Sequence, residues 1–458
     1  MLEKLMFKKV ELWLVTLFAL AVALATILFG YTVWYNMRGG ERFPDFSAAM
    51  VGIAKAPHVP IKTLNALLRE SELRTADHYP EISGFAFSAK PGATTRLGYL
   101  LLNRHDGDRK ISVSELVDLD RQKTIHTWDY DVDKIWDGLE IKSQLVHPKL
   151  DAHTSRFQGI HALLSADGSV VTQGMGTPLF KLDVCGKLMW AQADEMFHHA
   201  IQADSAGNIW VPAYLEPKQV SLGRDSDFHD DAIVKVSPTG EILFRKSVIE
   251  LMDQNNLGAL FYSAGQIGNN DPVHLNDIEP VLTSGPYWQE GDLLLSLRNK
   301  SMLVLYRPST NKVLWHRAGP WLNQHDVDVL DDHRISVFDN NMRLQGVSNL
   351  EVAGYSRVLA YDFKTDTVTA LLAPSVENLG MQATLQGLAD TTESGDMMIE
   401  NSLMGRLVQL DPNGRISWQY INRAKNGAVY VVNWSRLVTR ELGDRVAAAV
   451  EKAKCDAK

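Results

Sequence analysis

The chain has 458 residues, of which 45% are hydrophobic and 22% are charged, so it can bury the core of one large domain or two medium ones. Its formal net charge of −9 argues against a general nucleic-acid partner or an anionic membrane surface as a partner, because neither attracts a surface of that overall sign. Any anionic substrate must therefore be bound by a local cluster of positive groups.

The first predicted element is a membrane span at residues 12–35, which carry no charged side chain. A run of this length crosses a hydrocarbon layer of ~30 Å at ~1.5 Å per residue. Aromatic residues that suit the membrane interfaces lie near its ends: Trp13, Tyr31, Trp34 and Tyr35. Lys4, Lys8 and Lys9 precede the span, which places residues 1–11 in the cytoplasm and everything after Arg38 outside.

A cleaved signal peptide is the alternative for this segment, because Ala21, Ala23 and Ala25 could form an A-x-A cleavage site. The apolar run continues from there to Tyr35, so we expect an uncleaved anchor. Residues 36–97 are then a stalk or N-terminal extension that packs loosely on the main domain, with one short amphipathic helix near residues 61–73.

Residues 98–432 have the short β-branched and aliphatic runs of an all-β domain. A unit recurs there in which an aliphatic run, a turn of Asp, Pro, Asn or Gly, and a second run follow one another. Its six copies are 117–128, 180–190, 234–244, 303–315, 358–371 and 407–418. Six copies with room for two further strands each predict a six-bladed β-propeller, because radial packing buries both faces of every sheet. A pair of two-sheet sandwiches is the alternative that the repeat count disfavours.

A second hairpin precedes most of these units, at 160–174, 198–213, 274–298, 324–340 and 385–401. Aligned on their turns, four histidines and one glutamine take equivalent places: His161, His199, His274, His325 and Gln386. The first strand of each propeller blade lines the central channel, so the sequence predicts a ring of four imidazoles there. Structural roles are assigned to nine others: His58, His78, His105, His126, His147, His153, His229, His316 and His333.

The last segment, residues 433–458, is predicted to be a helical tail with Leu437, Leu442, Val446 and Val450 on one face, capping the propeller edge. The two cysteines, Cys185 and Cys455, lie in a turn and in this tail. Their spacing matches no metal or redox motif. A disulfide between them requires an oxidising compartment and is not favoured, because a tail cysteine is usually mobile.

Arg298 follows one of the inner strands and belongs with the histidines. Imidazole can act as a nucleophile, proton donor or anion ligand, and the planar fork of arginine matches tetrahedral oxyanions, so the set suits a sulfate or phosphate ester. Imidazoles around an axis could instead bind a transition metal, with Asp277, Glu279 or Asp326 orienting them. The fixed charge of Arg298 argues against that. Phosphate-binding loops, paired catalytic carboxylates and G-x-S-x-G elbows are absent from the sequence.

The motifs HLND (274–277), SLRN (296–299), QHD (324–326) and FDNN (338–341), together with the His198–His199 pair, resemble those of the bacterial arylsulfate sulfotransferases. YSRVLAYD (355–362) and NWSR (433–436) are also similar to that family, and the resemblance spans roughly residues 100–435. These enzymes are six-bladed propellers of the bacterial envelope. The sequence departs from the family in HHAI (198–201), where an acidic residue is commoner after the pair, and in its anchor, where soluble members have a removable signal.

The resemblance implies that His325 attacks the sulfur of an aryl sulfate and passes the sulfuryl group, through a sulfohistidine, to a phenol in a ping-pong reaction. It implies that His199, His274 and Arg298 bind the sulfate, with His199 carrying the proton, and that no nucleotide, cofactor or metal takes part. The residues expected to bind substrate around them are His161, His198, Asn276, Asn340 and Arg357. Asp326 is the residue expected to hold the His325 tautomer.

These features predict a single-pass protein of the bacterial inner membrane, with its N-terminus in the cytoplasm and its propeller in the periplasm or outside the cell. Its expected partners are an aryl sulfate, a phenolic acceptor and the membrane, and no nucleic acid. Two other functions stay open at this point: a non-catalytic envelope propeller that serves as a binding or assembly scaffold, and a His-ligated metal-dependent enzyme.

Overall fold

The computed structural model describes residues 11–37, 44–55, 73–88, 97–141, 143, 153–222, 228–263, 270–345, 349–392 and 394–455. The chain divides into two compact units. The first contains helices α2 (Leu12–Met37) and α3 (Pro44–Lys55). The second begins at Arg69, excludes residues 223–225 and contains the strands. Residues 61–72 of the predicted amphipathic helix lie outside the described residues.

Helix α2 has the properties of a membrane-crossing helix. Its segment Leu12–Tyr35 has a mean hydropathy of 2.6, and its side chains are mostly exposed. The hydroxyls of Thr16, Thr26 and Thr32 donate to carbonyls one turn earlier at 2.8–2.9 Å, so these polar groups are satisfied within the helix. By length and composition, an anchor and a signal sequence share these properties.

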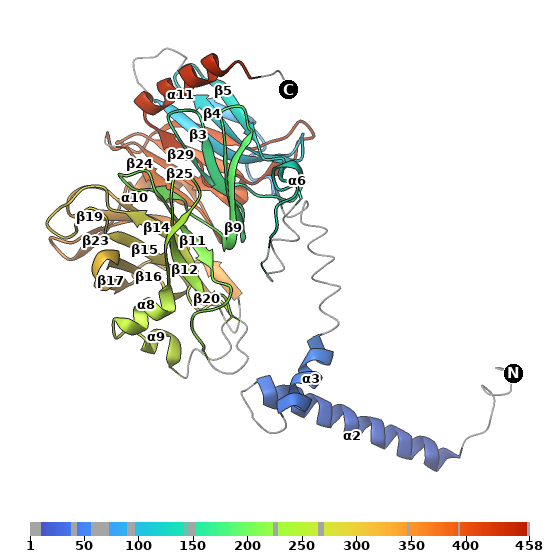
Figure 1. Cartoon of the computed structure of the whole chain (residues 1–458). Coiled ribbons are helices and arrows are strands. Elements are labelled where there is room, and N and C mark those ends of the chain that lie inside the picture. Colours follow the sequence, from blue (N-terminus) through green and yellow to red (C-terminus); the bar gives the residue numbers. More distant parts are fainter. Residues whose placement is uncertain are drawn as a thin grey trace. The chain divides into compact units, whose positions relative to one another are not determined.

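The second unit is a propeller-like arrangement of antiparallel sheets (Figure 1). One four-stranded sheet contains β14 (Leu275–Pro280), β15 (Leu293–Leu297), β16 (Met302–Arg307) and β17 (Lys312–Ala318). Another contains β18 (His325–Val329), β19 (Arg334–Asp339), β22 (Arg357–Asp362) and β23 (Thr367–Ala370). A third contains β29 (Arg436–Val438), β3 (Tyr99–Asp106), β4 (Ile111–Asp118) and β5 (Lys123–Asp129).

Two larger sheets complete the unit. The five-stranded sheet contains β24 (Leu388–Thr391), β25 (Met397–Asn401), β26 (Arg406–Leu410), β27 (Ile416–Ile421) and β2 (Gly84–Phe87). The eight-stranded sheet contains β6 (Ile160–Leu164), β7 (Val170–Gln173), β8 (Thr177–Leu182), β9 (Leu188–Phe197), β10 (Gln202–Ala203), β11 (Ile209–Tyr214), β12 (Asp231–Val236) and β13 (Ile242–Ser247). The prediction of an all-β, propeller-like fold is confirmed.

The hairpins follow from local turn chemistry. In the turn between β26 and β27, Asp411 Oδ1 accepts the backbone N–H groups of Asn413 and Arg415 at 2.9 Å. Gly414 adopts φ 77°, a conformation that an L side chain would strain. Both the aspartate and the glycine are visible in the sequence, which is why the hairpins could be predicted there.

The C-terminal segment differs from its predicted helical form. Its first part is strand β29, which pairs with β3 from the beginning of the propeller, so residues 436–438 join the two ends of the domain. Helix α11 (Arg440–Ala453) starts only after Thr439, whose hydroxyl accepts the Leu442 N–H. Leu437 therefore belongs to a strand. The predicted C-terminal helix is present, but it is shorter than the segment to which it was assigned.

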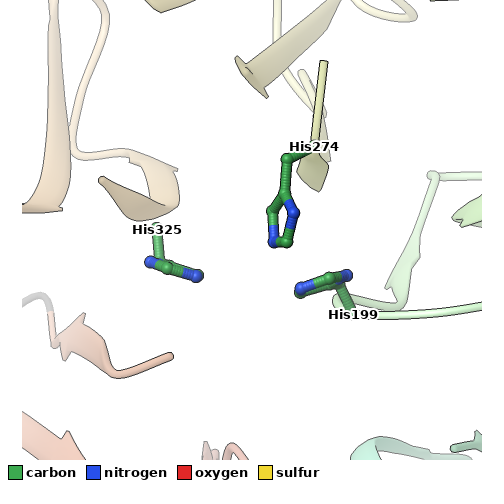
Figure 2. A group of neighbouring side chains, drawn as sticks. All are labelled: His199, His274 and His325. Atoms are coloured by element: carbon green, nitrogen blue, oxygen red, sulfur yellow. The ribbon is translucent and has the colours of Figure 1, made fainter. Parts of the chain in front are cut away.

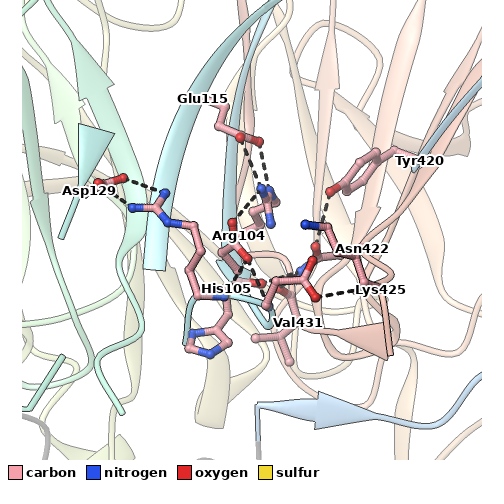
Figure 3. Close-up of polar contacts among 11 residues, drawn as sticks. Arg104, His105, Glu115, Asp129, Tyr420, Asn422, Lys425 and Val431 are labelled. Carbon is pink, nitrogen blue, oxygen red and sulfur yellow. Dashed lines mark hydrogen bonds and ion pairs between the residues drawn. The ribbon is translucent and has the colours of Figure 1, made fainter. Parts of the chain in front are cut away.

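Part of the segment expected to be a loose stalk also joins the sheets. Strand β1 (Arg74–Thr75) pairs with β28 (Val429–Tyr430), and β2 pairs with β27. Near this junction Figure 3 shows polar contacts, among them those of Arg104 and Asn422. The Arg104 guanidinium contacts Glu115 at 2.8 Å, and the Asn422 amide donates to the carbonyls of His105 and Val431 at 2.9 Å.

A disulfide joins Cys185, in the turn between β8 and β9, to Cys455 just beyond α11, with the two Cα atoms 5.3 Å apart. The sequence did not favour this pair because the tail was expected to be mobile. Instead α11 packs Leu442, Val446 and Val450 onto a buried cluster that includes Trp128, which fixes the position of the tail. The helix and the disulfide thus connect the sheet of β3 to the sheet of β8.

Connections between strands differ at the two ends of the sheets. One end has tight turns, such as 183–187, 204–208, 237–241 and 411–415. Most of the longer connections lie at the other end, where the first strand of each hairpin begins, at 130–159, 215–230, 248–274, 340–356 and 371–387. They contain α6 (Val132–Ile135), α8 (Val248–Gln254), α9 (Ala259–Tyr262), α10 (Ala373–Leu379) and the hairpin of β20 (Met342–Gln345) and β21 (Asn349–Val352). Loops of this kind commonly carry binding and catalytic groups.

Candidate functional site

Three histidines from different sheets meet at the loop end of the second unit (Figure 2). His199 precedes β10, His274 immediately precedes β14, and His325 is the first residue of β18. One ring nitrogen from each lies within 4.8 Å of those of the other two. The ring centroids of His199 and His274 are 4.8 Å apart, and those of His199 and His325 are 6.4 Å apart. We refer to these residues as the histidine cluster.

The tautomer of His325 is determined by Asn340. The Asn340 amide nitrogen donates to the carbonyls of Ala383 and Gln386 at 2.9 and 2.7 Å, so its Oδ1 is an acceptor. That oxygen lies 2.7 Å from His325 Nδ1, which must therefore carry the proton. Burial and then the nearby Arg298 lower the pKa of His325 well below its usual value. His325 is consequently neutral, with the lone pair on Nε2.

His274 has a carboxylate behind it. Its Nδ1 lies 2.5 Å from Asp271 Oδ2, so this nitrogen also carries a proton and Nε2 is left for the cluster. Burial opposes ionisation of Asp271, but the hydrogen bond from His274, together with the influence of His274, His229 and His198, lowers the pKa of Asp271 overall. The carboxylate is therefore ionised at neutral pH and holds the His274 ring in one orientation.

His199 is backed by its neighbour His198, with their Nδ1 atoms 2.7 Å apart. The pKa of His199 is lowered well below its usual value, first by burial and then by electrostatic repulsion from His274 and His198. His198 is only 1% exposed and its ring stacks on Tyr214 with centroids 4.1 Å apart. Of this pair, His199 is the one that faces the other histidines.

Arg298 supplies fixed positive charge beside the cluster. It begins the short 3-10 helix η2 (Arg298–Lys300) directly after β15 and is buried. One terminal nitrogen donates to Asn299 at 2.8 Å, while within the described part of the chain Nε has no hydrogen-bond partner. Its charge lowers the pKa of both His199 and His325, after the larger effect of their burial. A buried guanidinium with an unused donor suits a tetrahedral anion.

Backbone strain accompanies several of these positions. His161, His199, His274 and Gln386 adopt φ values of 48°, 59°, 54° and 58°, in the left-handed region that side chains rarely occupy. His325 does not share this conformation. His274 lies two residues before the irregular step at Asn276, whereas His325 lies one residue before the corresponding step at Asp326. His161, His199 and His274 therefore occupy equivalent places in their hairpins, as predicted, whereas His325 is displaced by one residue.

His161 stands apart from the histidine cluster, so the four predicted imidazoles do not form one ring. It is buried against Trp434 with ring centroids 5.3 Å apart, and its Nδ1 accepts the Ile201 N–H at 3.2 Å. Trp434 lies 5.9 Å from the His325 ring and 6.4 Å from the His199 ring. The indole is thus an aromatic wall of the cluster. Sequence reasoning missed it, although the motif NWSR contains it.

The other predicted substrate-binding residues have different surroundings. Asn340 lies behind His325, and His198 lies behind His199. Arg357 pairs with Asp339 at 2.5 Å. Asn276 donates to the Gln324 carbonyl at 2.8 Å, and its buried Oδ1 lacks a hydrogen-bond partner among the described residues. Asp326 accepts the Ala389 N–H at 2.7 Å, so it does not hold the His325 tautomer.

The cluster is better suited to an anion than to a cation. Three imidazole nitrogens at this separation are close enough to approach a metal ion. However, the buried guanidinium of Arg298 acts on two of the three rings, and a divalent cation beside that charge would be repelled. For a sulfate or phosphate ester the same charge is attractive. The arrangement can bind such a group and offers a neutral imidazole nitrogen to attack it.

Comparison with known proteins supports this assignment. The family model described as Arylsulfotransferase (ASST) matches residues 158–423, more than half of the chain. The match includes all three residues of the histidine cluster and Arg298, and it ends before Trp434. Among curated proteins, none matches the chain.

Several solved structures match part of the chain at low sequence identity and with TM-scores below 0.5. A protein of unknown function from Bacteroides caccae has a TM-score of 0.46 and 13% identity, over 73% of this chain and 98% of its own. A virginiamycin B lyase from Staphylococcus aureus has a TM-score of 0.38 and 10% identity, over 73% and 88%. TolB from Acinetobacter baumannii has a TM-score of 0.43 and 10% identity, over 74% and 67%. Similarity at this level supports no conclusion about substrate.

Proposed function

Because the chain belongs to the arylsulfotransferase (ASST) family, we propose that it transfers a sulfuryl group from an aryl sulfate to a phenolic acceptor by a ping-pong reaction. The family implies a sulfotransferase; the donor, the acceptor and the covalent intermediate are our proposal. The observation that carries it is the neutral His325, whose proton is held on Nδ1 by Asn340 while Nε2 faces His199 and His274 beside Arg298.

In the first step the lone pair on His325 Nε2 attacks the sulfur of the aryl sulfate. A nitrogen–sulfur bond forms, and the bond between sulfur and the aryl oxygen breaks. The bonding electrons leave on that oxygen, which takes a proton from His199. Arg298 binds the sulfuryl oxygens as charge shifts between them, beside the His274 ring that Asp271 orients.

In the second step a phenol takes the place of the product. Its proton goes to His199, its oxygen attacks sulfur, and the nitrogen–sulfur electrons return to His325 Nε2. Asn340 is an amide and cannot remove the Nδ1 proton, so the sulfated ring remains a cation. Because a neutral imidazole departs readily from a cationic sulfated ring, the intermediate can donate its sulfuryl group to a phenol without any nucleotide.

Trp434 is the proposed support for the aryl ring. Its indole borders both His199 and His325, the residues that would act on the aryl oxygen and on sulfur. An aromatic wall at this point can stack on a phenyl group, which a purely polar pocket would not favour. This arrangement supports an aryl rather than an alkyl ester.

We also propose six blades for the propeller. Strands β9 and β11 share two paired positions, Phe197 with Ala213 and Met196 with Tyr214. The longer pairings lie on either side of this contact, which supports dividing the eight-stranded sheet before β10 into two four-stranded blades. With the other four sheets of four or five strands, the count is six.

The proposed location is the bacterial inner membrane, with α2 as an uncleaved anchor, residues 1–11 in the cytoplasm, and the propeller in the periplasm or outside the cell. The Cys185–Cys455 disulfide supports an oxidising compartment for the propeller. Membrane fractions should retain the full-length chain after high-salt washing. Recovery of a soluble chain lacking the residues before Ala25 would instead favour a cleaved signal.

The activity is tested with the full-length chain in detergent and a chromogenic aryl sulfate. We expect sustained release of the coloured phenol only when a second phenol is supplied, and loss of this release in His325→Ala. His316→Ala, at an exposed position on β17, is the matched control and should retain full activity. Equal release with and without the acceptor would indicate a sulfatase, and normal turnover by His325→Ala would reject the role of His325.

A further inference from the structure

Behind His199 lies a connected set of buried polar side chains that the two chemical steps above do not use. His198 Nδ1 is 2.7 Å from His199 Nδ1, and His198 Nε2 is 3.1 Å from Asp231 Oδ1. The last two atoms are close but do not meet in hydrogen-bond geometry. His198, His199 and Asp231 are at most 3% exposed. The three side chains lead from the histidine cluster into the interior.

We propose that Asp231 and His198 form a proton relay that stores, between the two half-reactions, the proton that His199 exchanges with the phenol oxygens. This inference rests on the proposed sulfotransferase function. In this scheme His199 contacts the substrate, whereas His198 and Asp231 act through it and are positioning residues.

The relay has two balanced states. In the first, Asp231 is ionised, His198 carries its proton on Nε2, and His199 carries its proton on Nδ1 with the lone pair on Nε2 facing the cluster. A phenol proton that arrives at His199 Nε2 displaces the Nδ1 proton to His198 Nδ1. The Nε2 proton of His198 then moves to Asp231. In the second state His199 carries its proton on Nε2, His198 carries its proton on Nδ1, and Asp231 is neutral.

The reverse movement serves the first half-reaction. The departing phenolate takes the proton from His199 Nε2, His198 returns its Nδ1 proton to His199, and Asp231 returns its proton to His198 Nε2. Neither His199 nor His198 has to remain an imidazolium at either stage. One proton is stored per acceptor phenol and released per leaving phenol, so a complete turnover leaves the protein unchanged.

The surroundings of Asp231 suit proton storage. Burial and the neighbouring Asp271 raise the pKa of Asp231, while His274 and His229 oppose the shift. Its other oxygen accepts the His274 backbone N–H at 3.0 Å. Burial lowers the pKa of His198 to about 3, against the opposing influence of Asp271 and the Ala213 carbonyl. His198 therefore stays neutral, as a relay that passes protons on without holding an extra one requires.

Tyr214 completes the group around the relay. It stacks on His198 and lies edge-on to His229, with centroids 4.1 and 4.5 Å apart. Burial and the two nearby carboxyls, Asp231 and Asp271, raise the pKa of its phenol well above the usual value. Tyr214 thus remains neutral and packs His198 in one orientation. The titratable groups that face Asp231 are His198, His229, His274, Asp271 and Tyr214.

A purely structural role for His198 and Asp231 makes a different kinetic prediction, because loss of packing slows every substrate alike. Loss of a proton relay slows weakly acidic phenols most, since an acidic nitrophenol is already ionised at neutral pH and needs no base. The dependence of the second half-reaction on the acidity of the acceptor therefore separates the two roles.

The test uses the full-length chain in detergent, charged with a nitrophenyl sulfate and then mixed with acceptors from unsubstituted phenol to nitrophenols. Asp231→Asn and His198→Asn are the variants; the asparagine of the second keeps an amide near the position of Nδ1 but loses the connection to Asp231. We expect both to slow transfer to unsubstituted phenol on the order of 10²-fold, to slow transfer to acidic nitrophenols far less, and to shift the pH profile for the weakly acidic acceptors.

A control and the following results decide whether the relay exists. Asp194→Asn, at an exposed carboxyl, should behave as the unaltered protein. An equal loss with every phenol, or no loss in either variant, would overturn the relay while leaving the sulfotransferase proposal intact. Failure of the unaltered protein to form a sulfuryl adduct on His325 would reject the proposed function itself. If Asp231→Asn does not fold, as judged by its melting temperature, His198→Asn alone carries the decision.

Discussion

His325 and Asn340 are 15 residues apart in the chain and meet at the ends of strands β18 and β19, with His325 Nδ1 2.7 Å from Asn340 Oδ1. The Asn340 amide nitrogen donates to two backbone carbonyls, so the atom that faces His325 is the amide oxygen, which is an acceptor. This single contact gives the imidazole a defined tautomer and directs its lone pair towards the other two histidines. In the reaction that we propose, this tautomer makes Nε2 of the buried histidine the nucleophile.

Asn340→Ala should lower kcat by about 10- to 100-fold, because a hydrogen bond to a charged ring contributes ~1.5–3 kcal/mol in the sulfated state. Asn340→Asp should instead stabilise the charged ring further and slow the second step, so that sulfated protein accumulates. Rapid-quench measurements of adduct formation and decay distinguish these effects. Asn413→Ala, in an exposed turn, is the control. Unchanged rates in both Asn340 variants would contradict the assigned tautomer.

Arg298→Lys should raise KM for the aryl sulfate by about tenfold or more, because a lysine retains the charge but loses the planar fork that binds two oxygens at once. Arg298→Gln should have a larger effect, since the charge is lost as well. Steady-state kinetics at several ionic strengths provide the measurement. Arg334→Lys, at the exposed first residue of β19, should leave KM unaltered. A normal KM in Arg298→Gln would mean that the guanidinium does not contact the sulfate.

Stability should fall as the pH rises above about 6.5, where the buried histidines no longer change charge while buried carboxyls still lose protons. Burial, together with neighbouring carboxyls such as Asp326, raises the pKa of Asp328 well above its value in the unfolded chain, and burial also raises that of Asp390. Such groups stabilise the fold fully below their unfolded pKa of ~4, and this contribution is lost as the pH rises through the folded value.

The buried histidines affect stability in the opposite direction. Because their pKa values are lowered in the folded protein, they favour the fold above about pH 6.5 and oppose it below. They therefore cannot offset the alkaline loss. Melting temperatures between pH 6 and 9 should show the decline, and Asp328→Asn should make it shallower, whereas Asp194→Asn should not. A melting temperature that is constant or rises with pH would contradict this account.

Cys455→Ser should destabilise the second unit by about 2–4 kcal/mol, because the disulfide closes a long loop between the β8–β9 turn and the end of α11. Denaturant titration with and without a reductant measures the difference, and the reductant should have no further effect on the variant. Since the histidine cluster lies at the opposite end of these sheets from the Cys185 turn, the activity of folded Cys455→Ser should be retained. Equal stability of the oxidised and reduced protein would indicate that the bond is not formed.

Much of the fold could be predicted because its signals are local. The aspartate and glycine of turns such as Asp411–Gly414 are visible in the sequence and recur with each hairpin. The apolar run that forms α2 is equally local. The parts that were missed depend on contacts between distant segments: β29 could be assigned to a sheet only by its pairing with β3, and the disulfide could be favoured only by knowing where α11 packs.

The sequence predicted the histidine cluster and Arg298, but it did not predict the contacts of Trp434 and Asn340 with the cluster. Repeat alignment brought His199 and His274 to comparable positions, but the irregular steps at Asn276 and Asp326 shift His325 by one residue, which no alignment on turns reveals. Trp434 reaches the cluster because the chain returns to its first sheet after Ile421. Asn340 was assigned to the substrate, because the backbone carbonyls that accept its amide protons could not be seen in the sequence.

The most direct test of the central claim is mass spectrometry of the full-length chain, mixed with an aryl sulfate in the absence of acceptor and digested under mildly alkaline conditions. We predict a sulfuryl adduct on the peptide that contains His325, which disappears when a phenol is added and is absent from His325→Ala. An adduct on another residue, or turnover without any adduct on His325, would contradict the proposed nucleophile.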